Sequence, residues 1–276
     1  MSNSNNNLSV SNFSTNETVL NEQNKNHFAI EIEDLKKTFD GKEFVVNGMN
    51  LKIPKGSLTV IIGYSGTGKS VLIKHILGLY KPTSGNLRIL NEDVLKMTPD
   101  QMTKFRCRFG VLFQGSALFD DMNVLENVCF PLIEHRRHLS LEQVNEIAIQ
   151  KLRMVGLDPK HFNKLPNQIS GGMQKRTGLA RALALDPEIM FYDEPTTGLD
   201  PILTEMVDNL ILNTHQQRKG MTSVVISHDL GAAFRIGDHI AMLDSGKCVL
   251  FGTPEEFMKS DIDLVKRFIN KGMKHS

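Results

Sequence analysis

The chain has 276 residues, 40% of them apolar, and a formal net charge of +1. This length suits one large domain with a side lobe, or two small domains. The near-neutral charge excludes an overall field that would draw the protein onto nucleic acid or acidic lipid, although a local basic patch stays open. The three cysteines are far apart and lack C-x-x-C spacing, which favours free thiols over disulfides or a zinc site.

The first 27 residues are rich in Asn, Ser and Thr, and we expect a disordered tail because so few apolar side chains cannot offset the entropy of ordering. The start of the chain has neither a basic segment nor an apolar segment typical of an export signal. No apolar run reaches the roughly 18 residues that a membrane-spanning helix needs. If the protein works at a membrane, we expect another subunit to place it there.

Apolar and polar residues alternate over 28–32, as in a half-buried strand. Residues 44–46 and 49–53 continue an antiparallel lead-in, and the apolar run 58–62, stopped by glycine, is typical of a buried strand. Further strands are expected at 86–90, 110–113, 188–192, 223–226, 239–243 and 247–251. These strands alternate with helical stretches, which favours an α/β fold with a parallel core sheet.

The segment from about 115 to 185 differs, because it is mostly helical and includes an amphipathic stretch at 141–155. We interpret it as a helical lobe inserted between core strands. A final helix is expected at 262–273, with one apolar face formed by Ile262, Leu264, Val265, Phe268 and Ile269.

Residues 63–70 fit the pattern G-x-x-x-x-G-K-S, directly after a predicted strand and at the start of a helix expected over 68–79. Glycines let backbone N–H groups converge on phosphate oxygens, and the helix N-terminus adds partial positive charge. Lys69 is expected to reach the β- and γ-phosphates, and the Ser70 hydroxyl to bind Mg²⁺. The flanking strand and helix disfavour the alternative of an ordinary glycine-rich turn.

The strand predicted over 189–192 ends in Asp193 and Glu194. We expect Asp193 to hold Mg²⁺ and Glu194 to polarise the water that attacks the γ-phosphate. The alternative is an acidic turn before a proline. The P-loop needs such an acid, and no other residue pair fits better.

Ser170, Gly171, Gly172 and Met173 begin a helix expected to run to about residue 185, and Ser170 is a natural N-cap. A second role is compatible with the first. The hydroxyl and the accessible N–H groups of the two glycines would face an anion across a dimer interface.

Four isolated residues complete the candidate site. Gln114 follows an apolar strand, where a glutamine can touch the metal or the attacking water. His228 also follows a strand and is either structural or a γ-phosphate contact. Asp200 precedes a proline, so it reads as an N-cap that can also contact a partner chain. Phe39 either stacks on adenine or belongs to the core.

Together these motifs resemble those of the ATP-binding cassette (ABC) ATPases, over residues 28–252. The correspondence covers Walker A (63–70), the Q-loop (Gln114), the signature (170–174), Walker B (189–194), the D-loop (197–200) and the H-loop (227–229). The fifth signature residue is usually Gln, whereas this chain has Met173. The resemblance implies a P-loop NTPase core with a parallel sheet, an antiparallel β subdomain and an inserted helical subdomain, in an ATPase domain at 28–260 followed by a C-terminal helix at 261–276.

The resemblance also implies an ATPase that uses ATP and Mg²⁺. The implied catalytic residues are Glu194, His228 and Gln114, and the implied metal contacts are Ser70, Gln114 and Asp193. The implied nucleotide contacts are Phe39, Gly63, Tyr64, Ser65, Gly66, Thr67, Gly68, Lys69, Ser70, Val71, Ser170, Gly171, Gly172, Met173 and Asp200.

A narrower resemblance covers residues 113–128 and 130–132, which are similar to the ATPases of the mammalian-cell-entry (MCE) lipid transporters, and more loosely 265–269. The order Gly115-Ser116 departs from the usual Ser-Gly of that group. This resemblance implies an ATPase homodimer on the cytoplasmic face of a bacterial inner membrane, beneath integral-membrane permease subunits. An MCE-domain protein would carry phospholipid or another hydrophobic substrate.

Three alternative functions differ from this interpretation. An importer ATPase for polar amino acids or osmolytes shares every catalytic motif, so only the stretch 114–132 discriminates. An ABC ATPase acting on DNA or ribosomes usually carries coiled-coil insertions, zinc modules or tandem cassettes, and no nucleic-acid partner is expected for this single near-neutral cassette. A module that binds nucleotide without turnover is disfavoured by Lys69, Asp193, Glu194 and His228.

Overall fold

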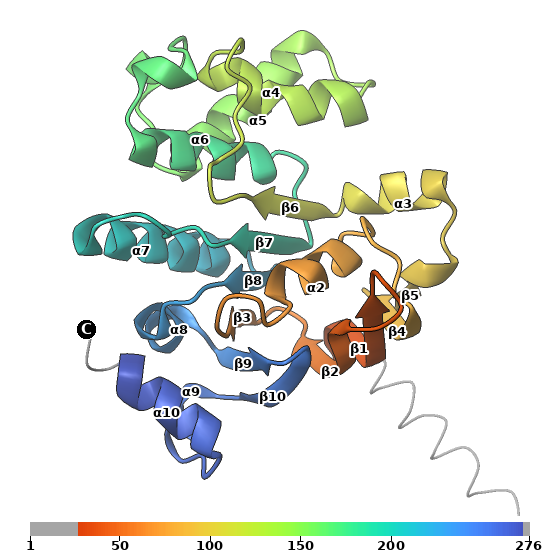
Figure 1. Cartoon of the computed structure of the whole chain (residues 1–276). Helices are drawn as coiled ribbons and strands as arrows, with labels where there is room; N and C mark the ends of the chain where they lie inside the picture. The colour runs from red at the N-terminus through yellow and green to blue at the C-terminus, as the bar shows by residue number, and fades with distance from the viewer. Residues whose placement is uncertain (1–26, 273–276) are drawn as a thin grey trace, which may run out of the picture.

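The computed structural model describes residues 27–272, so the expected tail falls almost wholly outside the described residues, as do residues 273–276. Two sheets organise the chain (Figure 1). The six-stranded sheet has the order β10-β9-β3-β8-β7-β6, formed by Lys247–Gly252, His239–Asp244, Leu58–Ile62, Thr222–Ile226, Ile189–Asp193 and Phe109–Leu112. The four-stranded sheet has the order β2-β1-β4-β5, formed by Phe44–Pro54, Phe28–Thr38, Ser84–Ile89 and Glu92–Asp93.

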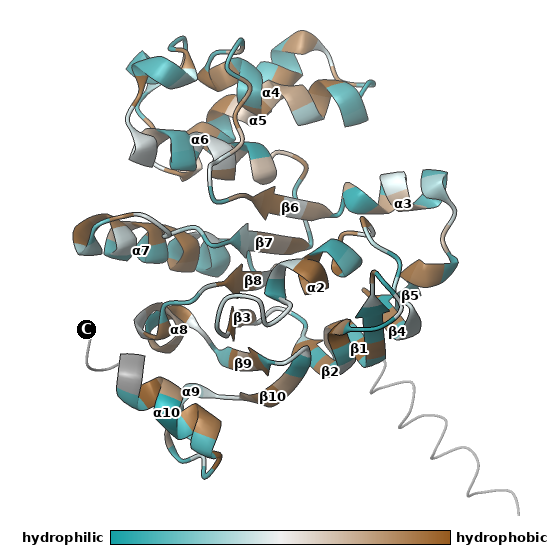
Figure 2. Cartoon of the chain, in the orientation of Figure 1, coloured by the Kyte–Doolittle hydropathy of each residue, from teal (hydrophilic) through white to brown (hydrophobic). Residues whose placement is uncertain are grey.

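The strands β9, β3, β8, β7 and β6 run parallel to one another, as the alternation of strands and helices predicted. Side chains of a strand point alternately to opposite faces. On β3, Val60 and Ile62 therefore join one hydrophobic cluster, while Ile61 joins the cluster on the other face. Both faces of this sheet are covered, which explains why its strands are almost continuously apolar and mostly brown in Figure 2.

Two of the expected strands pair antiparallel with their neighbours and do not join the parallel part of the core sheet. β4, expected over 86–90, lies in the antiparallel sheet beside β1. β10, expected over 247–251, pairs antiparallel with β9 at the sheet edge. The expected strands 44–46 and 49–53 form the single strand β2, which continues through Gly48 at a φ of 81°. Local alternation of apolar residues marks a strand without showing which sheet it joins.

The helices follow capping signals in the sequence. Ser140 and Gln143 form a capping box at the start of α5 (Leu141–Met154), and Asn123 and Glu126 form another at α4 (Val124–His135). These two helices and α6 (Gly171–Ala182) form the helical layer at the top of Figure 1. Their buried residues, including Val128, Ala148 and Leu179, pack into the same cluster as one face of the six-stranded sheet.

The remaining helices surround the core sheet. They are α2 (Lys69–Ile76), α3 (Pro99–Arg106), α7 (Pro201–Gln217), α8 (Leu230–Ile236), α9 (Pro254–Met258) and α10 (Asp263–Gly272), with short 3-10 turns at Val94–Lys96, Pro159–His161 and Pro166–Gln168. Within residues 27–272, no helix combines the length and apolar character needed to cross a bilayer.

The strand order positions the candidate site. β3, β8 and β7 are neighbours in the sheet and run parallel, so their carboxyl ends meet at one edge. The loops that leave these ends are 63–68, 227–229 and 194–200. Motifs that are more than 100 residues apart in the chain therefore lie side by side, as expected for a ligand site at the carboxyl edge of a parallel sheet.

Candidate nucleotide-binding site

The loop between β3 and α2 has a backbone that only glycine adopts easily. Gly63, Gly66 and Gly68 have φ values of 154°, 81° and 97°. A Cβ atom at Gly63 would lie 2.4 Å from the Leu243 carbonyl oxygen, and one at Gly68 would lie 2.9 Å from the Val45 carbonyl oxygen. Both obstacles are backbone atoms, so glycine is required for the turn as well as for the approach of a phosphate.

The side chain of Lys69, the first residue of α2, folds back against this loop. This side chain is buried, and Nζ donates hydrogen bonds to the carbonyl oxygens of Gly63 at 2.6 Å and Tyr64 at 2.8 Å. Burial lowers the pKa of Lys69, while the nearby carboxylates of Glu194 and Asp193 act in the opposite direction. An ammonium beside a helix N-terminus is suited to binding a polyphosphate.

Asp193 and Glu194 follow each other at the end of β7. Burial, and then the charge of Glu194, raise the pKa of Asp193 above its usual value of 3.8. Glu194 has a φ of 45°, and its N–H donates to the Ile226 carbonyl oxygen of β8 at 3.1 Å. This left-handed turn is a strained conformation that the neighbouring strand holds in place. Two adjacent carboxylates so placed favour a bound cation.

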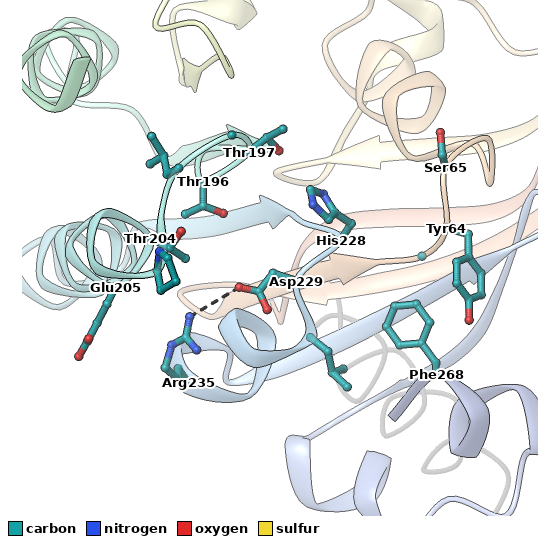
Figure 3. Close-up of a pocket in the computed structure, with 15 residues that line it drawn as sticks. Tyr64, Ser65, Thr196, Thr197, Thr204, Glu205, His228, Asp229, Arg235 and Phe268 are labelled. Atoms are coloured by element: carbon teal, nitrogen blue, oxygen red, sulfur yellow. Dashed lines mark ion pairs between the residues drawn. The ribbon is translucent and has the colours of Figure 1, made fainter. Parts of the chain in front are cut away.

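His228 lies beside this acidic pair. Its Nδ1 is 3.7 Å from Oε2 of Glu194, and the Thr197 hydroxyl donates to the same oxygen at 2.9 Å. More than half of the His228 side chain is exposed, whereas that of Glu194 is largely covered. Figure 3 shows the imidazole projecting between Thr197 and Ser65. A histidine there can donate to a γ-phosphate while Glu194 faces the attacking water.

A cleft of about 1000 Å³ joins these loops. It is lined by parts of the P-loop, by residues 196–199, by His228 and Asp229, and by Phe268 of α10. Asp200, the N-cap of α7, lies next to this lining, and its side chain accepts a hydrogen bond from the Leu203 N–H at 3.0 Å. The signature residues 170–173 do not line this cleft.

The signature residues lie at the N-terminus of α6, in the helical layer. Ser170 caps the helix, with Oγ accepting from the Met173 N–H at 3.4 Å, so the N-cap interpretation is confirmed. Ser170 and Gly171 are exposed, and a Cβ atom at Gly171 or Gly172 would meet nothing within 4 Å. The Met173 side chain instead packs against the hydrophobic cluster beneath the helical layer.

Phe39 follows β1 and is 59% exposed, so it lies outside the core. Its ring packs edge-on against Tyr80, with centroids 5.4 Å apart, and Lys37 Nζ lies 5.0 Å from the ring centroid. An exposed aromatic ring supported in this way suits stacking on a base. Whether it does so stays a prediction.

Gln114 is exposed just after β6, and its contact with the metal stays a prediction. Its carbonyl oxygen accepts a hydrogen bond from Lys175 of α6 at 3.2 Å. Sequence reasoning missed Lys175 and treated α6 only through its N-terminus. It named Tyr64 only as an implied nucleotide contact, whereas the Tyr64 ring packs edge-on against Phe268 with centroids 5.1 Å apart.

The residues present fit a magnesium-bound triphosphate. Ser70 is exposed in the first turn of α2, and the partly buried carboxylate of Asp193, at the end of β7, acts electrostatically on its neighbour Lys69. Residues 27–272 contain no group of three His, Cys, Asp or Glu side chains able to hold a metal alone. Mg²⁺ commonly uses one or two protein oxygens together with phosphates and water. When bound, it would offset phosphate charge during hydrolysis.

This combination of fold and motifs defines an ATP-binding cassette. Residues 46–197, more than half of the chain, match the family described as ABC transporter, and the chain belongs to this family. It is therefore an ATP-binding subunit of a transporter, and it is an ATPase that uses ATP and Mg²⁺. The P-loop NTPase fold with parallel and antiparallel sheets, predicted from the motifs, is confirmed.

Two relatives illustrate the similarity. A probable ribonucleotide transport ATP-binding protein of Mycobacterium leprae is 41% identical over 88% of this chain and 69% of its own length. The intermembrane phospholipid transport system ATP-binding protein MlaF of Haemophilus influenzae is 36% identical over 88% of this chain and 91% of its own length.

A solved structure gives the same fold. An ATP-binding cassette in a dimeric, post-hydrolysis state bound to ADP and Pi has a TM-score of 0.73 and 34% identity, covering 81% of this chain and 98% of that one. A glycine betaine/proline betaine transport system ATP-binding protein of Escherichia coli is also similar, at 39% identity over 85% of this chain and 58% of its own length.

Proposed function

We propose that two copies of this chain form a head-to-tail dimer that closes around two ATP–Mg²⁺, and that this cycle drives transport of phospholipid or another hydrophobic substrate. In each site, Lys69 and Ser70 of one chain hold the nucleotide. Ser170 and Gly172 of the partner complete the pocket. Glu194 activates the attacking water, and His228 contacts the γ-phosphate.

One observation carries the dimer. The start of α6 is open, since a Cβ atom at Gly171 or Gly172 would meet nothing within 4 Å, and a helix N-terminus is suited to an anion. The signature residues nevertheless do not line the cleft beside the P-loop of their own chain. A second chain can bring its α6 N-terminus to this cleft. Hydrogen bonds to charged groups contribute about 1.5–3 kcal/mol each, so several around one triphosphate would stabilise the closed dimer. The dimeric state of the related cassette supports this arrangement.

The surface after β6 is suited to a permease. Phe113 and Phe119 are 44% and 38% exposed, and Phe119 packs against Phe130 of α4. Ile133, one turn further along α4, is 49% exposed. These apolar side chains lie in and beside the stretch 114–123, and we propose that a cytoplasmic helix of a permease subunit docks there. This would place the chain at the cytoplasmic face of a bacterial inner membrane.

The lipid substrate rests on the stretch 113–132 and on the similarity to MlaF, whose description names intermembrane phospholipid transport. An MCE-domain protein would then complete the assembly. The alternative is an importer of polar amino acids or osmolytes, which the similarity to a betaine transport protein favours. Affinity purification of the full chain from detergent-solubilised membranes separates the two. An MCE-domain partner supports lipid transport, and a solute-binding receptor overturns it.

The nucleotide site is tested with Lys69→Ala. This change removes the ammonium that faces the phosphates, so we expect no ATP hydrolysis and no Mg–ATP binding by the purified chain. Lys247→Ala, on the exposed edge strand β10, is the matched control and is expected to retain both. Turnover by Lys69→Ala at the rate of the unmodified chain would contradict the site.

A further inference from the structure

Lys175 of α6 is a buried ammonium that lies between two loops of the candidate site. It is 7% exposed, and its Nζ donates to the carbonyl oxygen of Gln114 at 3.2 Å and to that of Pro195. Pro195 directly follows Glu194. Within residues 27–272, no carboxylate forms an ion pair with Lys175. One side chain thus joins the loop after β6 to the loop after β7.

Lys175 belongs to a stripe of contacts along one face of α6. Gly178, three residues on, approaches the loop so closely that a Cβ atom there would lie 3.1 Å from the Ser116 carbonyl oxygen. Arg181, three residues further, donates to the carbonyl oxygens of Ser116 at 2.9 Å and Ala117 at 2.8 Å. Residues spaced by three share a helix face. The stripe therefore fixes residues 114–117 to α6.

The loop that this stripe holds is strained. Ser116 and Ala117 have φ values of 60° and 48°, a region that non-glycine residues rarely adopt. Such a conformation persists only where surrounding contacts determine it. Burying an ammonium without a carboxylate is also unfavourable, and burial lowers the pKa of Lys175. Two unfavourable features at one junction indicate a functional constraint rather than simple packing.

We propose that Lys175 is a positioning residue that ties the Glu194 loop and Gln114 to the signature end of α6, and thereby links the two nucleotide sites of the dimer. This inference rests on the proposed function. In a head-to-tail dimer, α6 of one chain faces the ATP held by its partner, whereas Glu194 of that same chain faces its own ATP. Binding of the partner's ATP against α6 of one chain would then align Glu194 of that same chain at its own ATP.

The test compares four purified full-length chains, which are the unmodified chain, Lys175→Gln, Lys175→Arg and Lys151→Gln. Lys151 is a matched control, because it is also a buried lysine of the helical layer, 8% exposed, but its partner is Asp186 at 2.6 Å, away from the site. Steady-state hydrolysis is measured against ATP concentration. Binding of a fluorescent ATP analogue is measured at a protein concentration that keeps the chain monomeric.

For Lys175→Gln we expect kcat to fall roughly 10- to 100-fold, as when a catalytic group is displaced by about 1 Å. We expect the Hill coefficient to fall towards one, from a value between one and about two for a two-site dimer. Analogue binding should be unchanged. Lys175→Arg should recover most of kcat because it keeps the charge. Lys151→Gln should lower the melting temperature while keeping kcat and the Hill coefficient.

Two results would overturn the proposal. One is an unchanged kcat and Hill coefficient in Lys175→Gln, and the other is an equal loss of kcat in Lys151→Gln, which would show a merely structural effect. Failure of the dimer itself is distinguishable, because the unmodified chain would then hydrolyse ATP as a monomer with a Hill coefficient of one.

Discussion

His228 Nδ1 lies 3.7 Å from Glu194 Oε2, although the two residues follow different strands. The parallel pairing of β7 with β8 sets this distance, and the hydrogen bond from the Glu194 N–H to the Ile226 carbonyl oxygen fixes the turn. The Thr197 hydroxyl donates to the same carboxylate oxygen and orients it. The sheet thus presents a carboxylate and an imidazole together at the edge where the phosphates are expected.

Replacement of His228 tests its proposed role at the γ-phosphate. In His228→Ala, we expect kcat to fall about 100-fold or more, because a positioned donor stabilises the charge that develops in the transition state. Because the imidazole is mostly exposed, stability should change little. His138→Ala, on the exposed loop after α4, is the control. Equal ATPase rates in the two variants would remove His228 from the site.

Replacement of Glu194 separates binding from hydrolysis. Glu194→Gln keeps the side-chain shape but removes the base, so ATP should bind and persist. We expect this variant to accumulate as a dimer with Mg–ATP and to stay monomeric with Mg–ADP, as measured by gel filtration with light scattering. A variant that stays monomeric with saturating Mg–ATP would contradict closure around the nucleotide.

The geometry of the P-loop predicts that replacing Gly63 with alanine is more destabilising than the same change at a glycine with open surroundings. Gly63→Ala brings Cβ to 2.4 Å from the Leu243 carbonyl oxygen, so the loop or β9 must shift. We expect a loss of about 1–3 kcal/mol in the free energy of unfolding, together with weaker ATP binding. Gly220→Ala is the control, because Gly220 also has a positive φ, of 86°, but a Cβ atom there would meet no other atom within 4 Å. It should cost about 1 kcal/mol and leave ATP binding intact.

The stability should depend on pH through His75 of α2. Its Nδ1 lies 2.7 Å from the Val71 carbonyl oxygen, whereas Nε2 is buried and lacks a partner among the described residues. Burial lowers the pKa of His75 below 6.5. The unfolded chain therefore binds a proton more readily than the folded chain, so stability is full above pH 6.5 and falls as the pH drops below it.

Each unit of difference in pKa corresponds to about 1.4 kcal/mol. We expect the free energy of unfolding, measured with urea, to decrease less between pH 7.5 and 5.5 for His75→Leu than for the unmodified chain. His215, whose pKa burial also lowers, should keep its contribution in both proteins. An identical pH dependence in both would show that His75 titrates normally.

Motifs whose function is local could be found from the sequence. Three such motifs lie at or just after the end of a strand, namely the P-loop glycines, the acid pair at the end of β7, and His228. Their chemistry can be inferred from their residue types alone. Ser170 was recognised as an N-cap for the same reason. The alternation of strands and helices predicted a parallel sheet but not its strand order, and the pairing of β3, β8 and β7 brings these motifs together.

Contacts that join distant backbone segments could not be found in this way. Lys175 donates to carbonyl oxygens 61 and 20 residues away, and backbone acceptors leave no trace in residue type. The one available signal was a lysine among the buried positions of α6. The contact between Tyr64 and Phe268 is similar, because it depends on how α10 returns to the P-loop.

The most direct test of the account measures ATPase rate per chain against chain concentration at saturating Mg–ATP, with sedimentation analysis of the same samples. Two chains that complete each other's pockets predict a rate per chain that rises with concentration and levels off where the dimer predominates. A full rate that is independent of concentration, in samples that remain monomeric, would contradict the shared site.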